Sequence, residues 1–249
     1  MCGRFAFYSP HEAVVQLFGV SGDWPGIEPR YNIAPTTLIP AVRVLPDDPQ
    51  TRRIAMLDWG LVPSWAKDRA LGAKMSNARG ETLREKPSFR NAYKSRRCLV
   101  LADGYYEWQR SAANKQPYYI HLASLEPFAM AGLWETWRDP ANGEALESCT
   151  LVTTSPIPSI AHIHDRMPVI LSPETYAEWL DPGNRDVERL DRLLAPNPAI
   201  ELSARPVRKL VNNARNQGPA LIEPVVDEPA PAPDDPPPDP SPAQGTLAL

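Results

Sequence analysis

Short apolar runs, several of them alternating with polar positions, are the commonest pattern along this chain and are typical of β-strands. They predict strands over residues 38–45, 52–59, 98–102, 118–122, 128–133, 149–153 and 169–171. Apolar residues at helical spacing predict helices over residues 11–18, 82–94, 173–180 and 187–194. Ser9 is the expected N-cap of the first helix, with Pro10 in its first turn, and Pro87 interrupts the second helix.

The order of these elements predicts the fold class. Most strands precede the later helices without regular βαβ alternation, which favours an α+β fold. We expect a single compact domain over residues 1–226, with a curved, mostly antiparallel β-sheet or barrel-like core and flanking helices. Residues 227–249 are rich in Pro and acidic residues, so we expect a disordered, extended tail there.

Charge is distributed unevenly along the chain. The formal net charge is −4, and the stretch from Glu228 onward holds four acidic residues and no Lys or Arg, so the rest of the chain is neutral on average. Residues 67–97, however, hold ten basic residues against Asp68, Glu81 and Glu85. This excess would attract a polyanion if it folds onto one face. A solvated helix surface would show the same composition.

The sequence also excludes some classes of protein. No run of about 18 apolar residues is present, so we expect no transmembrane helix, and the N-terminus lacks the regions of a signal peptide. The cysteines Cys2, Cys98 and Cys149 have no short spacing, which argues against a disulfide framework or a Cys-based zinc site. We therefore expect a soluble cytoplasmic protein, a monomer without metal or other cofactor.

Cys2 directly follows the initiator methionine and is the first candidate for chemistry. Removal of Met1 would leave a thiol and an α-amine on one residue, and both groups titrate near enough to neutral pH to act as nucleophiles. The amine could attack an aldehyde and the thiol could then close a five-membered thiazolidine. The pair could also serve as an N-terminal nucleophile, with the amine as base. The alternative is a small buried residue.

Further along the chain, Asn77, Arg79 and Glu107 have side chains suited to a site. An Asn amide can orient a nucleophile, and an Arg guanidinium binds phosphate oxygens bidentately; helix capping and solvent exposure are the alternatives. Glu107 lies among aromatic residues, where partial desolvation would favour acid–base chemistry. The alternation of the preceding strand leaves open whether it faces water instead.

His162 and His164 belong to the segment SIAHIHDRMPVIL and are two of four histidines. An imidazole can transfer protons or hydrogen-bond an oxygen leaving group. The adjacent Asp165 and Arg166 could orient the ring and contact phosphate, or the segment could be a simple turn. Further zinc ligands are missing nearby, so metal binding is not expected. Trp65 and other tryptophans near the basic residues could stack on bases of single-stranded DNA, although most aromatic residues pack in cores.

Taken together and in this order, the motifs are specific. They are MCGRF at the start, YNIAPT at 31–36, WGLVPSW at 59–65, SNAR followed by ET at 76–82, EKPSFR, RRCLVLADGYYEW, AGLWE and TTSPIPSIAHIHDRMPVIL. From residue 2 to about 220 the chain resembles the SOS response-associated peptidase (SRAP) family. The resemblance implies a compact α+β domain with a positively charged groove for single-stranded DNA. It also implies covalent capture of abasic sites through a thiazolidine, which shields the lesion, and self-removal of the leading residue.

The resemblance assigns roles to individual residues. Cys2 matches the crosslinking nucleophile, Asn77 the residue that positions it, Glu107 the acidic residue that manages protons, and His164 the residue that protonates the sugar oxygen. Phosphate contacts are implied for Arg4, Arg79 and Arg166, and contacts beside or on the bases for Pro35 and Trp65. The implied partner is single-stranded DNA containing abasic sites, on the nucleoid when bound. The chain departs from many relatives at Gly80, where they carry Cys.

Two other functions fit some of these residues. A cysteine peptidase or amidohydrolase would use Cys2 as nucleophile with His164 or Glu107 as acid–base. A non-catalytic nucleic-acid-binding module would need no nucleophile. The basic segment 67–97 fits the DNA-binding functions better than a hydrolase. The resemblance further implies an autoprocessing peptidase with DNA–protein crosslinking, to which a lyase-like activity could be added.

Overall fold

A closed five-stranded barrel forms the centre of the molecule in a computed structural model, which describes residues 2–45, 47–109 and 115–225. The predicted tail at 227–249 lies outside the described residues. The barrel strands follow the order β10-β4-β3-β6-β9, and β9 pairs again with β10 to close it. These strands are β3 (Leu38–Leu45), β4 (Asp48–Trp59), β6 (Arg97–Ala102), β9 (Phe128–Arg138) and β10 (Ala145–Thr154). All pairs in the ring are antiparallel except β4 with β10.

Three short strands extend the barrel sheet. β5 (Asn77–Arg79) runs parallel to the last residues of β10, and β11 (Met167–Pro168) pairs antiparallel with the same end of β10. β12 (Ile170–Leu171) pairs with β9. Because β10 contacts four other strands, it is the common support for segments that are far apart in the sequence.

A second sheet of five antiparallel strands has the order β13-β8-β7-β1-β2. It consists of β1 (Phe5–Phe7), β2 (Arg30–Ile33), β7 (Gly104–Gln109), β8 (Gln116–Leu122) and β13 (Leu202–Pro206). The chain passes from the barrel strand β6 into β7 at the buried Asp103. Its carboxylate accepts hydrogen bonds from the backbone N–H groups of Tyr8 (2.5 Å) and Ser9 (2.9 Å), which fixes the segment after β1.

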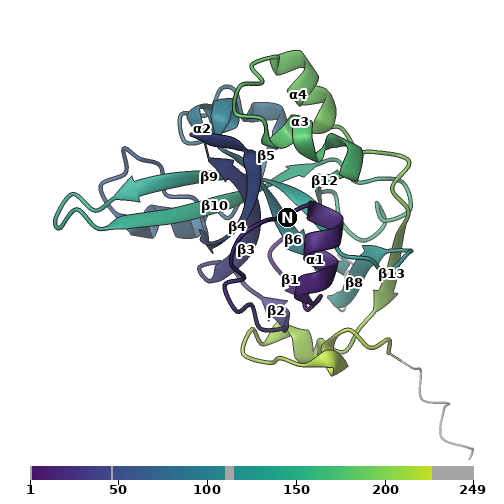
Figure 1. Ribbon diagram of the computed structural model, residues 1–249. Coiled ribbons are helices and arrows are strands. Elements are labelled where there is room, and N and C mark those ends of the chain that lie inside the picture. The colour runs from purple at the N-terminus through teal and green to yellow at the C-terminus, as the bar shows by residue number, and fades with distance from the viewer. Residues whose placement is uncertain (1, 46, 110–114, 226–249) are drawn as a thin grey trace, which may run out of the picture.

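Helices cover the barrel at one end and beside the second sheet. α1 (His11–Phe18) is the predicted first helix, whereas α2 (Arg90–Ser95), α3 (Tyr176–Leu180) and α4 (Val187–Leu193) gather at the end of the barrel away from β2 (Figure 1). The β9–β10 hairpin projects from the barrel as an arm. The remaining helical turns are 3₁₀ turns: η1 (Arg69–Lys74), η2 (Gly80–Thr82), η3 (Pro173–Thr175), η4 (Lys209–Asn212) and η5 (Pro219–Leu221).

The structure confirms the predicted fold class, a mostly antiparallel barrel-like core with flanking helices in one domain. Two local predictions are wrong. The helix expected over 82–94 is present only from Arg90, because Pro87 and the turns around it end the helical pattern. Ser9 does not cap α1: Pro10 is at the N-cap without a side-chain hydrogen bond, and the Ser9 hydroxyl donates to the buried Asp103 carboxylate instead. Among the described residues, no helix is long and apolar enough to cross a membrane.

Candidate active site

Cys2 lies immediately before β1, against the barrel. Its side chain is fully buried, and its carbonyl oxygen accepts a hydrogen bond of 2.8 Å from the side-chain amide of Asn77. Asn77 begins β5 and pairs with Leu151 on β10, so the barrel holds the amide in place. Asn77 Oδ1 has no hydrogen-bond partner among the described residues. The amide therefore fixes the Cys2 main chain and leaves an acceptor beside it.

The Cys2 thiol is in an apolar environment with one carboxylate near it. Its Sγ lies 3.9 Å from the carbonyl oxygen of Arg4. Burial raises the pKa of the Cys2 thiol well above its ordinary value, and the negative charge of Glu107 raises this pKa further. The thiol is therefore protonated at neutral pH, and a base must take its proton when it attacks an electrophile.

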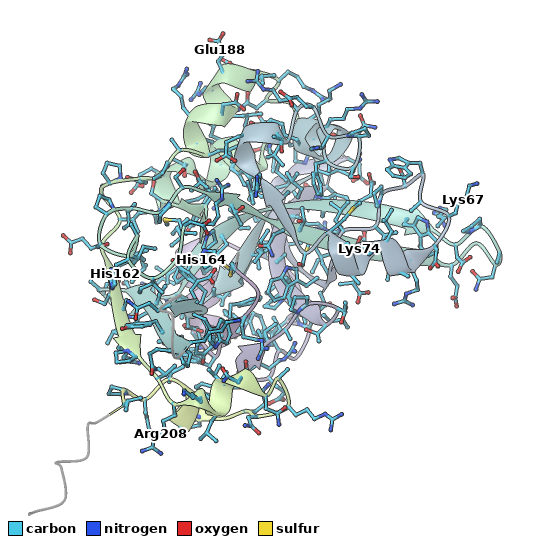
Figure 2. The ribbon with its side chains drawn as sticks, turned by 180° about the vertical axis from the view of Figure 1, so that it is seen from behind. Lys67, Lys74, His162, His164, Glu188 and Arg208 are labelled. Carbon is cyan, nitrogen blue, oxygen red and sulfur yellow. The ribbon has the colours of Figure 1, made fainter. Side chains whose placement is uncertain are left out.

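Glu107 and His164 form the polar side of the same site. Glu107 is within β7 rather than after a strand, its side chain is 4% exposed, and its Oε2 lies 3.8 Å from Nε2 of His164. His164 is in the loop between β10 and β11, where the neighbouring Ile163 packs in the core. His162 is exposed, so of the two histidines only His164 joins the site (Figure 2).

The environment of Nδ1 determines which protons the His164 ring carries. The backbone N–H of Arg166 donates to Nδ1 over 3.0 Å, so in the neutral ring the proton is on Nε2, the nitrogen that faces Glu107. Asp165 Oδ1 is also 3.0 Å from Nδ1 and would accept a hydrogen bond from Nδ1–H if the ring were charged or in the other tautomer. The ring can thus hold a transferable proton toward Glu107.

Arg166 is anchored beside this histidine. Its guanidinium donates to both carboxylate oxygens of Glu81, over 2.6 and 3.0 Å, and to the carbonyl oxygen of Thr153 over 2.6 Å. The ion pair holds the pKa of Glu81 below its ordinary value. Arg79 is exposed on β5, two residues after Asn77. One of the two arginines beside the site therefore has an acidic partner already.

The sequence model of the family described as "SOS response associated peptidase (SRAP)" matches residues 1–214. This chain belongs to the SRAP family. It is 45% identical over 226 residues to the abasic site processing protein YoqW of Bacillus subtilis, covering 90% of this chain and 99% of that protein. It is 34% identical over 232 residues to the abasic site processing protein HMCES of Xenopus tropicalis, covering 82% and 69%. A crystal structure of a protein from Bacteroides thetaiotaomicron has a TM-score of 0.80 at 26% identity, covering 90% and 100%.

The other predicted contact residues of this SRAP chain lie at different depths. Arg4 is half-buried and donates to Asn32 Oδ1 (2.7 Å) and to the carbonyl oxygen of Val211 (2.9 Å). Pro35 is half-buried in the turn before β3, whose next residue Thr36 adopts a left-handed φ of +66°. A β-branched residue is strained in this conformation, so the turn is held by its surroundings.

Trp65 is the most accessible aromatic candidate, with 57% of its surface exposed. It lies in a turn closed by the hydrogen bond from the Ala66 N–H to the Pro63 carbonyl (2.9 Å). The Trp137 indole N–H donates to the Ala66 carbonyl (2.7 Å) and ties the turn to β9. An indole ring presented to solvent on a fixed turn is suited to stacking on a base.

The basic residues of 67–97 do not form one surface. Arg97 is buried and donates to the main-chain carbonyls of Tyr93 and Trp179, each over 2.6 Å. Arg96 pairs with Glu135, and Arg84 pairs with Asp191. Lys67 and Lys74 lie along the arm, well away from His164 (Figure 2).

Sequence reasoning did not identify two residues at this site. Glu81 binds Arg166 and belongs to the ET pair of the SNAR–ET motif, which is the sequence signal that could have identified it. Tyr105 is fully buried on β7, two positions before Glu107. Burial is the main cause that raises the pKa of its hydroxyl, and electrostatic interactions with Cys2 and Glu107 raise it further. Its hydroxyl has no hydrogen-bond partner within the described part of the chain.

Proposed function

We propose that this SRAP protein processes abasic sites in single-stranded DNA by forming a covalent thiazolidine between Cys2 and the aldehyde of the abasic sugar. The observation that carries the proposal is that two side chains bear on Cys2. The Asn77 amide is 2.8 Å from its carbonyl oxygen, and the charge of Glu107 raises the pKa of its thiol. His164 completes the group, 3.8 Å from Glu107. The names of the relatives YoqW and HMCES support abasic-site processing as the general activity.

The reaction begins once Met1 has been removed, by methionine excision or by self-processing. The neutral α-amine of Cys2 attacks the aldehyde carbon of the ring-opened abasic sugar, and loss of one water from the resulting carbinolamine gives an imine. The thiol sulfur then adds to the imine carbon, its proton leaves, and the imine nitrogen gains a proton. The product is a five-membered ring that contains both heteroatoms of Cys2, formed with the loss of one water overall.

The neighbouring side chains have proton-transfer and positioning roles in this scheme. Asn77 holds the Cys2 carbonyl, and its Oδ1 can accept a hydrogen bond from the α-amine of Cys2 that removal of Met1 leaves. Glu107 receives the proton of the buried thiol, whose raised pKa makes such a base necessary. His164 presents the Nε2 proton and delivers it to the sugar ring oxygen as the ring opens.

DNA contacts are proposed for residues outside the group of Cys2, Asn77, Glu107 and His164. Arg79 and Trp65 are exposed and are suited to a phosphate and a base, respectively. Arg4, Arg166 and Pro35 are further candidates, but the two arginines already have protein partners. Binding should weaken as salt increases because phosphate contacts release counterions, whereas the covalent product should persist in high salt.

The raised pKa of the Cys2 thiol favours aldehyde capture over a general cysteine peptidase or amidohydrolase. Such hydrolases rely on a thiolate or on a thiol activated by a lowered pKa. Here burial and Glu107 both act in the opposite direction. An amine-first reaction does not require a resting thiolate, since the amine forms the first bond.

The test uses tag-free protein whose loss of Met1 is confirmed by intact mass. It is mixed with a single-stranded oligonucleotide carrying one abasic site, and with the intact oligonucleotide as control. We expect a denaturant-stable adduct without added reductant, with the mass of protein plus DNA minus one water, on the abasic strand only. Absence of this adduct from correctly processed protein would overturn the proposal.

A further inference from the structure

We infer that Glu81 is a positioning residue for His164: its carboxylate anchors Arg166, and the main chain of Arg166 selects the His164 tautomer. The inference rests on the proposed function in that His164 is taken as the proton donor of the capture reaction. It assigns a task to a residue outside the group of Cys2, Asn77, Glu107 and His164.

The first link is the anchor between two loops. Glu81 lies in η2, directly after β5, and Arg166 directly precedes β11. The carboxylate receives two hydrogen bonds from one guanidinium, at 2.6 and 3.0 Å, the paired geometry in which an Arg–carboxylate interaction is strongest. The same guanidinium donates to the carbonyl oxygen of Thr153 on β10 over 2.6 Å. Two hydrogen bonds thus hold the Arg166 side chain to Glu81, and two more, counting the Thr153 hydroxyl at 3.3 Å, hold it to the barrel strand β10.

The second link runs through the main chain of Arg166. Its backbone N–H donates to His164 Nδ1 over 3.0 Å, which makes Nδ1 an acceptor and leaves the proton of the neutral ring on Nε2. Asp165 Oδ1 is equally close to Nδ1, at 3.0 Å, and favours the opposite arrangement, with a proton on Nδ1. If the Arg166 main chain moves away, Asp165 gains the advantage. The Glu81 anchor therefore decides between two protonation patterns of one ring.

The geometry also distinguishes this role from simple competition for DNA. If Glu81 merely occupied a phosphate-binding arginine, its neutralisation would release the Arg166 fork and strengthen binding of single-stranded DNA. If Glu81 positions His164, neutralisation slows capture even when the protein is saturated with DNA. The two accounts predict changes in different quantities.

The kinetic test compares Glu81→Gln with Glu85→Gln, which changes the charge equally at an exposed position of the same segment. Reductant-free adduct formation is followed at saturating abasic-site oligonucleotide, and affinity is measured with the intact oligonucleotide. We expect Glu81→Gln to lower the rate at saturating DNA about tenfold, because misplacement of a reacting group by about 1 Å can cost about 100-fold and the ring here keeps its place but changes its proton pattern. Glu85→Gln should keep the wild-type rate, and Glu81→Asp, which is one methylene shorter, should be slowed like Glu81→Gln.

A double-mutant cycle separates positioning from a general loss of stability. In a His164→Ala background, Glu81→Gln should cause no further loss of rate, because its effect passes through His164. Thermal melting of each variant controls for folding. A wild-type saturated rate in Glu81→Gln, or an equal loss with and without His164, would overturn the inference.

A second readout does not depend on crosslinking at all. The ¹⁵N chemical shifts of labelled histidine report which ring nitrogen carries the proton in the free protein, and subtraction of the His164→Ala spectrum assigns the signal. We expect protonated Nε2 in the wild type and a shift toward protonated Nδ1 in Glu81→Gln. If wild-type protein forms no adduct but this shift occurs, the proposed function fails and the positioning role stands. An unchanged tautomer in Glu81→Gln would contradict the inference in either case.

Discussion

The site around Cys2 and the basic segment 67–97 differ in how distance along the chain relates to distance in the fold. Cys2, Asn77, Glu107 and His164 come from four distant parts of the chain and meet at one site, where Asn77 is half-buried and the other three side chains are buried. The basic residues of 67–97 are neighbours in sequence, yet the fold distributes them between the arm, the surface and the interior. Arg97 is buried and Arg96 is paired with Glu135.

The difference arises from what holds each group. Strand pairing fixes the backbone of Asn77 and Glu107, because β5 lies on β10 and β7 lies between β1 and β8. A buried polar group must find partners, so its position is strongly determined. An exposed lysine needs no such partner because water solvates its charge, so its position is set by the local backbone alone. Chemistry in this domain therefore depends on the sheet network, whereas local charge density is a poor guide to the DNA-binding face.

Substitution of Cys2 tests the buried group most severely. Cys2→Ala keeps the α-amine after removal of Met1 but lacks the thiol, so it can form an imine and no thiazolidine. We expect complete loss of the adduct that survives without reductant, with affinity for intact single-stranded DNA unchanged within about threefold, a free-energy difference below 1 kcal/mol. Cys98→Ala, a change at another fully buried cysteine, is the control and should crosslink normally.

Glu107→Gln should have the next largest effect on capture. The amide has nearly the same shape but cannot take the thiol proton, so we expect the saturated rate to fall by about 100-fold, within the range for loss of a general base. Single-turnover crosslinking measures this rate. A rate equal to that of the wild type would show that Glu107 does not move a proton in the slow step.

How much the sequence could predict is clear from these same residues. The strands over 38–45 and 98–102 and the helix over 11–18 follow from local patterns, because each contains its own apolar signal. The three-residue strands β1 and β5 escaped prediction, since so short a segment is a strand only through its tertiary partners. The order of motifs indicated the four site residues. Their mutual distances, and the anchor at Glu81, required the fold.

Trp65 is an exposed residue outside the buried site. Trp65→Ala removes an exposed ring, so we expect about tenfold weaker binding of single-stranded DNA, within the 1–3 kcal/mol range for base stacking. The exposed Val15 on α1 provides a control, and Val15→Ala should leave affinity unchanged. Fluorescence anisotropy with a labelled oligonucleotide measures both. Equal affinities of the two variants would exclude Trp65 from the DNA interface.

Arg79 and Arg97 belong to the same basic segment but differ in burial. Arg79→Ala should weaken DNA binding only a few-fold and reduce the salt dependence by about 0.7, the value for one single-strand phosphate contact. Arg97→Met should leave the salt dependence unchanged and lower the melting temperature, because it strips buried main-chain carbonyls of their donor. The opposite outcome for the pair would mean that the segment acts as one surface.

The smallest expected effect concerns the pH dependence of stability. Arg166 lowers the pKa of Glu81 below its ordinary value of 4.5, so Glu81 binds its proton less readily in the folded state. Its contribution to stability is therefore fully present above pH 4.5 and disappears as the pH falls through the lowered pKa. Urea unfolding of the wild type and of Glu81→Gln should differ near neutral pH and converge in acid. A constant difference across this range would contradict the ion pair.

In the proposed thiazolidine, the α-nitrogen and the sulfur of Cys2 are both bonded to the abasic sugar. The chain has three cysteines, Cys2, Cys98 and Cys149, so thiol counting tests this claim directly. The purified adduct is denatured, alkylated with iodoacetamide and weighed beside the free protein. We predict three alkyl groups on the free protein and two on the adduct, with Cys2 unlabelled. Three groups on the adduct would show that the thiol remains free and would contradict the thiazolidine.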